Sequence, residues 1–392
     1  MMTREKEYFI HLLAGFLNGE APKPMAVDWT KIFELADKHS VQAIVSQQIK
    51  SLPAEVAPQG KLKSMFNQQI GRTIQAYDKR LEAIAVLESF FCDSKTDYMF
   101  VKGACISRYY PVPEYRTGGD IDVIVRDIDF GSVVRLLRNH WQVKDNSNVA
   151  VLTVNDVEVE IHSACSIRGQ YFDDIFALAE QIEEHKYQLG MYHQLLYVLR
   201  HIGKHLSHSG AGVRMLMDVD VLVRAIPDFD NQVFTDMCMH ADCQKIWNTI
   251  SSLVHLWFAT PVDWDRQVVT DSVLMSKLER VFLDGGVFGL SQFDLGDYYI
   301  TKSLGTGQQV TAGTRARAVL RFIFPGTAVL CNQFGYAKKH KFLLPVAFCH
   351  RLFLGVFARF GHSKDTLNAI LRNDSDISVV HRDLLQELGI TE

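Results

Sequence analysis

Apolar residues recur at helical spacing in the first quarter of the chain, follow a strand-like pattern in a short middle segment, and return to helical spacing afterwards. The N-terminal helical pattern runs from Tyr8 to about Phe91, and breaks at residues 21–24 and 53–60 divide it into several helices. From about Phe172 the pattern is helical to the end of the sequence. It predicts amphipathic helices over residues 195–206, 213–223, 233–241, 246–258 and 274–282.

The middle segment contains short runs of β-branched and other apolar residues, which predict strands. Asn155 and Asp156 are turn residues between two of these runs and predict a hairpin. Short helices are expected over residues 104–109 and 132–139. The predicted strands cover residues 98–101, 120–125, 149–154 and 157–161.

A small mixed β-sheet between two helical parts is an α+β architecture. A chain of 392 residues is also long enough for two or three domains. We therefore expect a helical N-terminal region over residues 1–95, a core with the mixed sheet over residues 96–185, and a large helical C-terminal domain over residues 186–392.

Asp120 and Asp122 lie one residue apart at the start of a predicted strand whose other residues are nearly all apolar. Successive side chains of a strand point to opposite faces, so the two carboxylates share a face, while Ile121, Val123 and Val125 point the other way. Paired carboxylates suit Mg²⁺ or Mn²⁺, which substrate phosphates also bind. The alternative is a turn or a solvated strand edge, although an unpaired carboxylate beside a buried strand is costly.

A third acidic residue is expected on the strand predicted over residues 157–161, because metal ions in phosphoryl transfer share their ligands among several carboxylates. The alternation places Glu158, Glu160 and His162 on one face of this strand. If the strand lies beside that of Asp120, Glu160 completes the site as a metal ligand or as the base for an acceptor hydroxyl. Glu158 takes this place in another register, and an edge strand with solvated glutamates is the alternative.

Gly103 and Ala104 stand where a predicted strand gives way to a helix. Small residues at such a turn let backbone amides approach phosphate oxygens, and the N-terminus of the following helix favours negative charge. Lys102 and Arg116 are further candidates for a triphosphate, and arginine has the forked geometry that suits phosphate. For these two cations an ordinary surface position is an equal alternative.

Residues 101–125, together with Glu160 and His162, resemble the nucleotidyltransferase superfamily that includes DNA polymerase β, and most closely an uncharacterised bacterial nucleotidyltransferase-like family. The shared features are a Lys-Gly turn, an arginine before Gly-Asp-Ile-Asp, and a later strand with an acidic residue two positions before a histidine. The resemblance extends to the helical segments at residues 201–224 and 325–357.

This resemblance implies an NTP as the donor substrate and a divalent metal centre. It assigns the metal ions to Asp120 and Asp122, the role of third acidic residue to Glu160, and the nucleotide-phosphate turn to Gly103 and Ala104. The wider superfamily usually has Gly-Gly or Gly-Ser at this turn, so Ala104 removes a possible hydroxyl contact.

His201 and His205 lie four residues apart on one face of a predicted helix, a spacing that suits a transition metal. Because no third ligand is evident, Lys204 and His205 are instead expected to line a groove near the nucleotide phosphates or the acceptor. The next predicted helix carries three charged residues that either form salt bridges between domains or contact the acceptor: Arg214, Asp218 and Asp220.

The composition excludes several classes of protein. A formal net charge of -4 and 22% charged residues are not those of a disordered chain or a strongly basic nucleic-acid-binding protein, although a local basic patch is compatible with an RNA acceptor. Seven cysteines without a C-x-x-C pair, and a start without a continuous apolar segment, favour reduced thiols in the cytoplasm over export or a cysteine-based zinc site.

No window of the sequence reaches the roughly 18 uninterrupted apolar residues of a membrane span. The most apolar window covers residues 342–360 and contains a proline, a histidine and two arginines, and the basic residues 338–341 precede it. This segment is either a buried C-terminal helix with a solvated basic lead-in or a segment that lies on a membrane surface.

We therefore expect a nucleotidyltransferase that depends on Mg²⁺ or Mn²⁺ and transfers a nucleoside monophosphate from an NTP to a hydroxyl acceptor by a two-metal mechanism. The acceptor can be a small molecule, an RNA or a protein. The alternative is a catalytically inactive protein of the same fold that acts as a binding or scaffold protein, for which peripheral contact with a membrane is one option.

Overall fold

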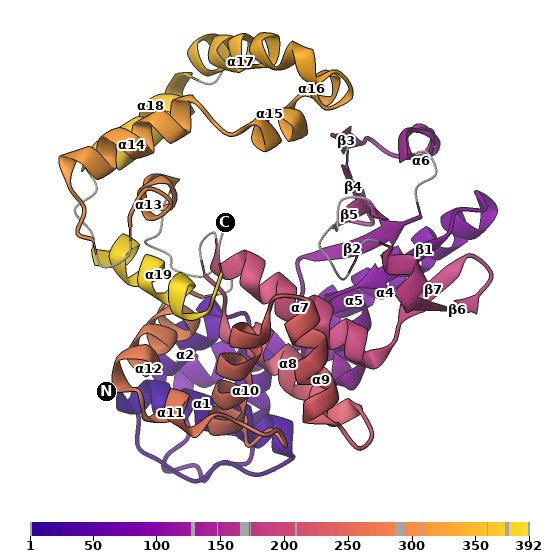
Figure 1. Cartoon of the computed structure of the whole chain (residues 1–392). Coiled ribbons are helices and arrows are strands. Elements are labelled where there is room, and N and C mark those ends of the chain that lie inside the picture. Colours follow the sequence, from indigo (N-terminus) through magenta and orange to yellow (C-terminus); the bar gives the residue numbers. More distant parts are fainter. Residues whose placement is uncertain are drawn as a thin grey trace.

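The computed structural model describes residues 2–126, 130–146, 148–164, 172, 174–207, 210–286, 295–305, 308–358, 360–372 and 376–390. It has the expected α+β architecture, in which a mixed sheet lies between helical N-terminal and C-terminal parts (Figure 1).

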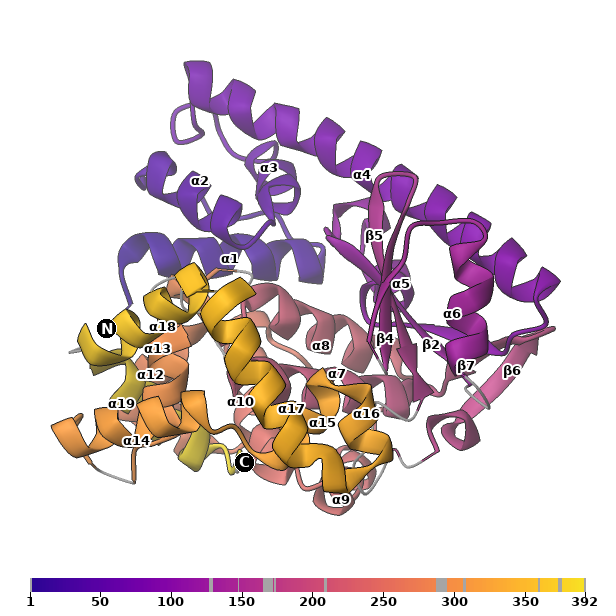
Figure 2. The same ribbon diagram turned by 90° about the horizontal axis from the view of Figure 1, so that it is seen from above.

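The N-terminal part consists of four helices. The expected breaks around residues 21–24 and 53–60 separate the first helix from the second and the third from the fourth, and a further break at residues 39–41, which was not expected, separates the second from the third. The first helix begins after Thr3, whose side chain accepts a hydrogen bond from the Lys6 amide, and ends at Gly19, which has a φ of 68°. The last helix is a single long rod that runs along one face of the sheet (Figure 2). The four helices are α1 (Arg4–Asn18), α2 (Trp29–Lys38), α3 (Gln42–Ile49) and α4 (Gly60–Asp93).

The sheet has seven strands among the described residues, in the order β3-β4-β5-β2-β1-β7-β6. The pairs β2–β5 and β1–β7 are parallel, and the other neighbours are antiparallel. A one-turn helix, α5 (Gly103–Ile106), follows β1, and α6 (Phe130–Arg138) follows β2. The strands are β1 (Tyr98–Val101), β2 (Asp120–Val125), β3 (Lys144–Asp145), β4 (Val149–Val154), β5 (Val157–Ser163), β6 (Ala179–Glu183) and β7 (Lys186–Leu189).

Both faces of the central strand β2 are covered, as its alternation predicts. Ile121, Val123 and Val125 pack with α4 and α6 in one core. Ile124 belongs to the larger core that the N-terminal helices share with the helices after the sheet. Asp120 and Asp122 lie on the same side of β2 as Ile124, so the two carboxylates face those later helices.

The expectation of an all-helical chain after residue 172 was wrong, because β6 and β7 form the outer strands of the sheet next to β1. Their sequences do not show the apolar alternation of a half-buried strand. Most of their side chains are polar and none in β6 is buried, since an outer strand covers little of the core. Residues 98–189 thus contain all the described strands.

The helices predicted over residues 195–258 are confirmed, with ends that differ by a few residues. They continue the larger core together with α1 and α3. The predicted helix at residues 274–282 corresponds to α12 and a π-helical turn at Arg280–Asp284. These helices are α7 (Met191–Leu206), α8 (Val213–Ala225), α9 (Asn231–His240), α10 (Gln244–Phe258), α11 (Arg266–Thr270) and α12 (Ser272–Glu279).

The last third of the chain forms an arm that extends away from the other helices in Figure 1. The arm (α14–α18, residues 312–372) has one small apolar core of its own and shares a second with α13 and Leu304. No described helix is both long and apolar enough to cross a membrane. The helices here are α13 (Leu295–Thr301), α14 (Ala312–Ile323), α15 (Thr327–Gln333), α16 (Gly335–Lys339), α17 (Leu344–Phe353), its π-helical continuation (Leu354–Ala358), α18 (Phe360–Arg372) and α19 (Asp376–Glu387).

Candidate functional site

The register of two parallel strands brings the predicted acidic residues together. Strand β5 pairs directly with β2, and Glu160 lies opposite Asp122, while Glu158 lies opposite Asp120. Because side chains alternate along both strands, all four carboxylates lie on one face of the sheet. Of the two registers considered from the sequence, the structure has the one that places Glu160 beside Asp122.

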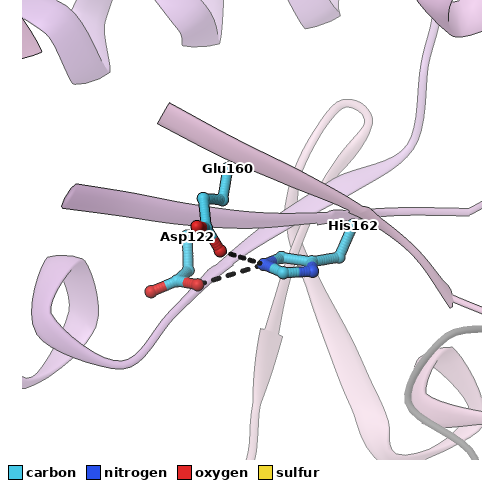
Figure 3. Close-up of side chains that lie close together, drawn as sticks. All are labelled: Asp122, Glu160 and His162. Carbon is cyan, nitrogen blue, oxygen red and sulfur yellow. Dashed lines mark hydrogen bonds and ion pairs between the residues drawn. The ribbon is translucent and has the colours of Figure 1, made fainter. Parts of the chain in front are cut away.

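Three side chains on this face converge on one point (Figure 3). The Nε2 atom of His162 lies 3.1 Å from Oδ1 of Asp122 and 3.3 Å from Oε2 of Glu160. Ligand atoms of the three residues all lie within 4.8 Å of one another, and the described residues contain no other such cluster of three or more His, Cys, Asp or Glu side chains. Two carboxylates and an imidazole can hold a divalent cation. Asp120 lies outside the cluster but on the same face.

Asp122 is the buried centre of the site, with 3% of its surface exposed. The Lys102 ammonium lies 2.6 Å from its Oδ1 atom, the same atom that faces His162. Burial would raise the pKa of Asp122, but hydrogen bonds from His162 and Lys102 outweigh it and lower the pKa to about 2. Asp122 is therefore a carboxylate at neutral pH, ready to bind a cation.

The pKa values of the groups around Asp122 are shifted in different directions. The hydrogen bond from His162 lowers the pKa of Glu160 against the effect of burial. Asp120, at the start of β2, keeps part of its surface exposed, but the partial loss of solvent around its carboxylate, and then the charge of Asp122, raise its pKa. Burial disfavours the charged form of His162, but hydrogen bonds to Asp122 and Glu160 prevail and raise its pKa. A protonated His162 can thus balance two ionised carboxylates.

Lys102 reaches Asp122 from a turn in an unusual conformation. Its φ is 54°, in the left-handed region that favours glycine, and it lies between β1 and α5. Such a residue costs roughly 1–3 kcal/mol and persists only where its surroundings hold it. Here the ion pair with Asp122 is one such constraint.

A cleft of about 410 Å³ opens over these carboxylates, between the sheet and helices α7 and α8. Most of the predicted site residues line it, including Glu160 and the glycine of the turn. Ala104 does not; it packs against the core beneath the sheet. The predicted or considered residues in the cleft wall are Lys102, Gly103, Arg116, Asp120, Asp122, Glu160, His201, Lys204, His205, Arg214 and Asp218.

Arg116 is buried, so the surface position considered for it is excluded. Its guanidinium donates two hydrogen bonds to Asp218 on α8, from Nη2 at 2.7 Å and from Nε at 3.2 Å. The Tyr110 hydroxyl donates a third bond to Asp218 at 2.6 Å. Burial disfavours the charge of Arg116, but the pair with Asp218 outweighs it and raises the pKa of Arg116. Asp218 therefore joins α8 to the sheet segment, as the salt-bridge interpretation predicts.

Gly103 is required by this pair. A Cβ atom at residue 103 would collide with the Arg116 guanidinium. Gly118 has the same relation to Arg80, whose Nη2 donates to the Arg116 carbonyl at 2.8 Å. Two glycines thus let two buried guanidinium groups lie against the backbone of the cleft wall.

Three arginines gather here, because Arg214 on α8 donates to the Thr117 hydroxyl at 3.0 Å. Burial, and then the charge of Arg116, lower the pKa of Arg80 to about 10, and the same causes lower the pKa of Arg214. A depressed arginine pKa means that the cationic form is under-compensated. This cluster of Arg80, Arg116 and Arg214 is therefore suited to an anionic ligand.

His201 and His205 face each other across one turn of α7, with 3.1 Å between their Nε2 atoms. They belong to no cluster of three ligands among the described residues. Burial lowers the pKa of His201 to about 2, so it is neutral. Asp220 does not line the cleft and pairs with Arg224 on its own helix. The structure therefore does not support an acceptor contact for Asp220.

A second cavity of about 480 Å³ lies beside the cleft. Asp120, Gly118 and Arg214 line both spaces, so the start of β2 stands between them. Most other groups in the second cavity are uncharged and hydrogen-bonding: Ser40, Gln42, Gln69, Thr73 and Thr117, with Arg72 and Glu158 as further charged groups.

The alternation of strand β5 predicts the face on which His162 lies, but His162 was not among the predicted metal ligands. Its position two residues after Glu160 was the available signal. Arg80 was missed, since it stands in the middle of α4, 36 residues before Arg116. The pair of Arg116 with Asp218 spans 102 residues, and nothing in the local pattern indicates it.

Comparison with known proteins supports the chemistry of the cleft. Residues 25–259, more than half of the chain, match the model of a family described as uncharacterised nucleotidyltransferase. The match includes the sheet and residues 201–224, but it ends before residues 325–357, where resemblance was also expected. The comparison with curated proteins finds no match. Because this family match covers more than half of the chain, the chain belongs to the uncharacterised nucleotidyltransferase family.

Proposed function

We propose that this chain is an active nucleotidyltransferase of the DNA polymerase β type, which transfers a nucleoside monophosphate from an NTP to a hydroxyl acceptor. The observation that carries the proposal is the pairing of Asp122 with Glu160 on adjacent parallel strands, on the floor of a cleft with cationic walls. Family membership supports the reaction class.

The acidic residues would hold divalent metal. Asp122 and Glu160 are both ionised and adjacent, and Asp120 adds a carboxylate at the same strand end. These three residues would share two Mg²⁺ or Mn²⁺ ions, which stabilise the charge on the transferred phosphoryl group. Because its pKa is lowered, Glu160 suits the role of metal ligand better than that of general base.

Lys102 and His162 act as the resident counter-charges of Asp122 and Glu160. Since both contact Oδ1 of Asp122, they hold this carboxylate in place. We infer that Lys102 turns towards the triphosphate when metal and nucleotide are bound. The arginine cluster and Lys204 would neutralise the phosphates from the α8 and α7 sides of the cleft.

In the reaction, the acceptor hydroxyl oxygen forms a bond to the α-phosphorus of the NTP and loses its proton. The bond between the α-phosphorus and the oxygen bridging to the β-phosphate breaks, and pyrophosphate leaves. Positioning and electrostatic stabilisation by the residues of the cleft supply most of the rate enhancement, as in other phosphoryl transfers.

The second cavity is the proposed entry for the acceptor. It meets the cleft at Asp120, Gly118 and Arg214, which line both spaces. Its many uncharged hydrogen-bonding side chains fit an acceptor with several hydroxyl or amide groups, such as a sugar-like small molecule. RNA and protein acceptors remain outcomes of the experiment below.

Thermal stabilisation by ATP, GTP, CTP and UTP with Mg²⁺ or Mn²⁺ tests the donor site. We expect a metal-dependent rise in melting temperature with at least one nucleotide, which Asp122→Asn/Glu160→Gln abolishes. Asp156→Asn is the matched control, because Asp156 lies in the hairpin turn at a φ of 64°, which asparagine tolerates. No shift with any nucleotide would favour the inactive binding or scaffold protein.

Transfer itself is tested with α-labelled NTPs and a cell extract. Label is expected in a small molecule, an RNA or a protein, and its fraction identifies the acceptor class. Labelling that persists in Asp122→Asn/Glu160→Gln would contradict the proposed mechanism.

A further inference from the structure

The charge of the C-terminal arm differs from that of the rest of the chain. Between Asp297 and Asp365 the sequence has ten Lys and Arg residues and no Asp or Glu, although the whole chain has a formal net charge of -4. Most of this acid-free segment lies in the arm. A cationic segment on an otherwise acidic protein is attracted to a polyanionic surface.

The arm also exposes large apolar side chains. Phe342 is 78% exposed, Phe357 72%, Phe353 59% and Val346 55%. Single exposed apolar residues are normal, but a contiguous set marks an interaction site. Further exposed apolar side chains in the arm are Leu320, Phe324, Val329 and Leu371.

The exposed side chains of α17 and its π-helical continuation form one stripe. Val346, Phe353 and Phe357 are separated by seven and four residues, which places them on the same helical face. The rings of Phe353 and Phe357 confirm this, with centroids 4.6 Å apart. The sequence left open a buried helix at residues 342–360, and this exposure argues against it.

Cations lie next to the stripe. Lys339 and Lys341 are exposed and lie next to Phe342, which precedes α17 and is the most exposed of the apolar side chains named in the arm. An apolar face flanked by lysine and arginine is the composition of helices that lie in the interface of an anionic membrane.

The arm is placed so that this surface does not belong to the nucleotide cleft. Helices α14 to α18 pack on one another and on α13, and none of their described residues lines the cleft. The family match ends at residue 259, before the arm begins. A role of the arm is therefore independent of the reaction proposed for the cleft.

The apolar residues distinguish between two polyanions. A nucleic acid binds cations and stacks its bases on aromatic rings, whereas Val346, Val329 and Leu320 gain nothing from base stacking. Aliphatic and phenylalanine side chains together gain from burial among acyl chains. The described helices do not span a membrane, so the contact is with its surface.

We propose that the C-terminal arm binds the surface of a membrane that contains anionic lipids. Phe342, Phe353 and Phe357 enter the layer below the headgroups, while Lys339 and Lys341 contact lipid phosphates. The arm would then hold the nucleotide cleft at the membrane.

Co-sedimentation of the full chain with vesicles tests the proposal. We expect binding to vesicles of equal parts phosphatidylcholine and phosphatidylglycerol, and much less to phosphatidylcholine alone. Raised salt should weaken the binding. Phe353→Ser/Phe357→Ser and, separately, Lys339→Glu/Lys341→Glu should each weaken it by roughly tenfold or more.

Matched controls come from exposed residues elsewhere. Val273→Ser changes an apolar side chain on α12 that is 62% exposed, and Lys61→Glu/Lys63→Glu reverses two exposed charges on α4. Both should leave vesicle binding unchanged. Equal loss in these controls, or no binding of the unaltered chain to the anionic vesicles, would overturn the proposal. So would binding of an oligonucleotide through the same residues without vesicle binding.

A fluorescent probe on a cysteine tests the proposed membrane contact without changing the apolar or charged residues of the arm. Cys349 is exposed within α17, and Cys92 is exposed at the far end of α4. With an environment-sensitive label, Cys349 should show a blue shift on addition of anionic vesicles, and Cys92 should not. Vesicle binding without a shift at Cys349 would refute the placement of the stripe in the membrane.

Discussion

Replacement of Asp218 by asparagine tests whether the cleft wall depends on a buried ion pair. The side chains of Arg116 and Asp218 are only 8% and 6% exposed. Asp218→Asn keeps the shape of the side chain and an oxygen for Tyr110, but removes the charge that compensates Arg116. The buried Arg80 and Arg116 and the half-buried Arg214 would then lie together with less negative charge nearby.

The expected loss follows from the geometry of the pair. Two hydrogen bonds to a charged group, at 2.7 and 3.2 Å, contribute roughly 1.5–3 kcal/mol each. Breaking one partner of a buried ion pair costs about 3–5 kcal/mol, which agrees with this sum. We therefore expect Asp218→Asn to lower the melting temperature by at least about 5 °C in scanning calorimetry.

A charge-free pair separates stability from function. In Arg116→Met/Asp218→Leu no buried charge remains unpaired, so most of the stability should return, while nucleotide binding stays weak because a cation of the cleft is lost. A loss below about 1 kcal/mol for Asp218→Asn is the value for an exposed ion pair. That result would refute the description of Asp218 as the structural partner of Arg116.

Three further predictions concern single residues. Gly103→Ala should cost about 1–3 kcal/mol and weaken nucleotide binding, because the added methyl group displaces the Arg116 guanidinium; calorimetry with and without nucleotide checks this, and unchanged values would contradict it. Lys102→Met should bind Mn²⁺ alone roughly tenfold more tightly, because the ammonium group that competes with the metal at Asp122 is gone, but it should bind NTP more weakly. Isothermal titration calorimetry measures both affinities. If both affinities rise or both fall, Lys102 does not compete with the metal. Burial lowers the pKa of His39 to about 4, so the unfolded chain binds a proton near pH 6.5 and the folded chain does not. The free energy of unfolding should therefore fall by about 3 kcal/mol between pH 6.5 and 4. Melting curves of His39→Gln should show a smaller fall, and an identical fall would show that His39 is not its cause.

The helices and strands that could be predicted from the sequence are those with a regular spacing of apolar residues, because this spacing determines both the conformation and the buried face. The strand at residues 120–125 alternates carboxylates with apolar residues, and the structure buries the apolar set against α4 and α6. Strands β6 and β7 escaped prediction because outer strands bury little, so their sequences lack such an alternation.

Those features of the site that depend on one strand alone could be predicted from the sequence. Alternation placed Asp120 and Asp122 on one face and Glu160 on one face of its own strand, but only the pairing of β2 with β5 fixes which carboxylates are opposite each other. Contacts between distant segments could not be predicted at all. Asp218 approaches Arg116 through the packing of α8 on the sheet segment, and a local pattern carries no information on that packing.

Mn²⁺ electron paramagnetic resonance measures whether Asp122 and Glu160 bind a divalent cation together with the nucleotide. Free Mn²⁺ should disappear on addition of the chain, and more completely when NTP is present. Asp122→Asn/Glu160→Gln should abolish this uptake, and Asp156→Asn should retain it. Equal uptake of Mn²⁺ by the double variant and the unaltered chain would show that Asp122 and Glu160 do not bind the cation.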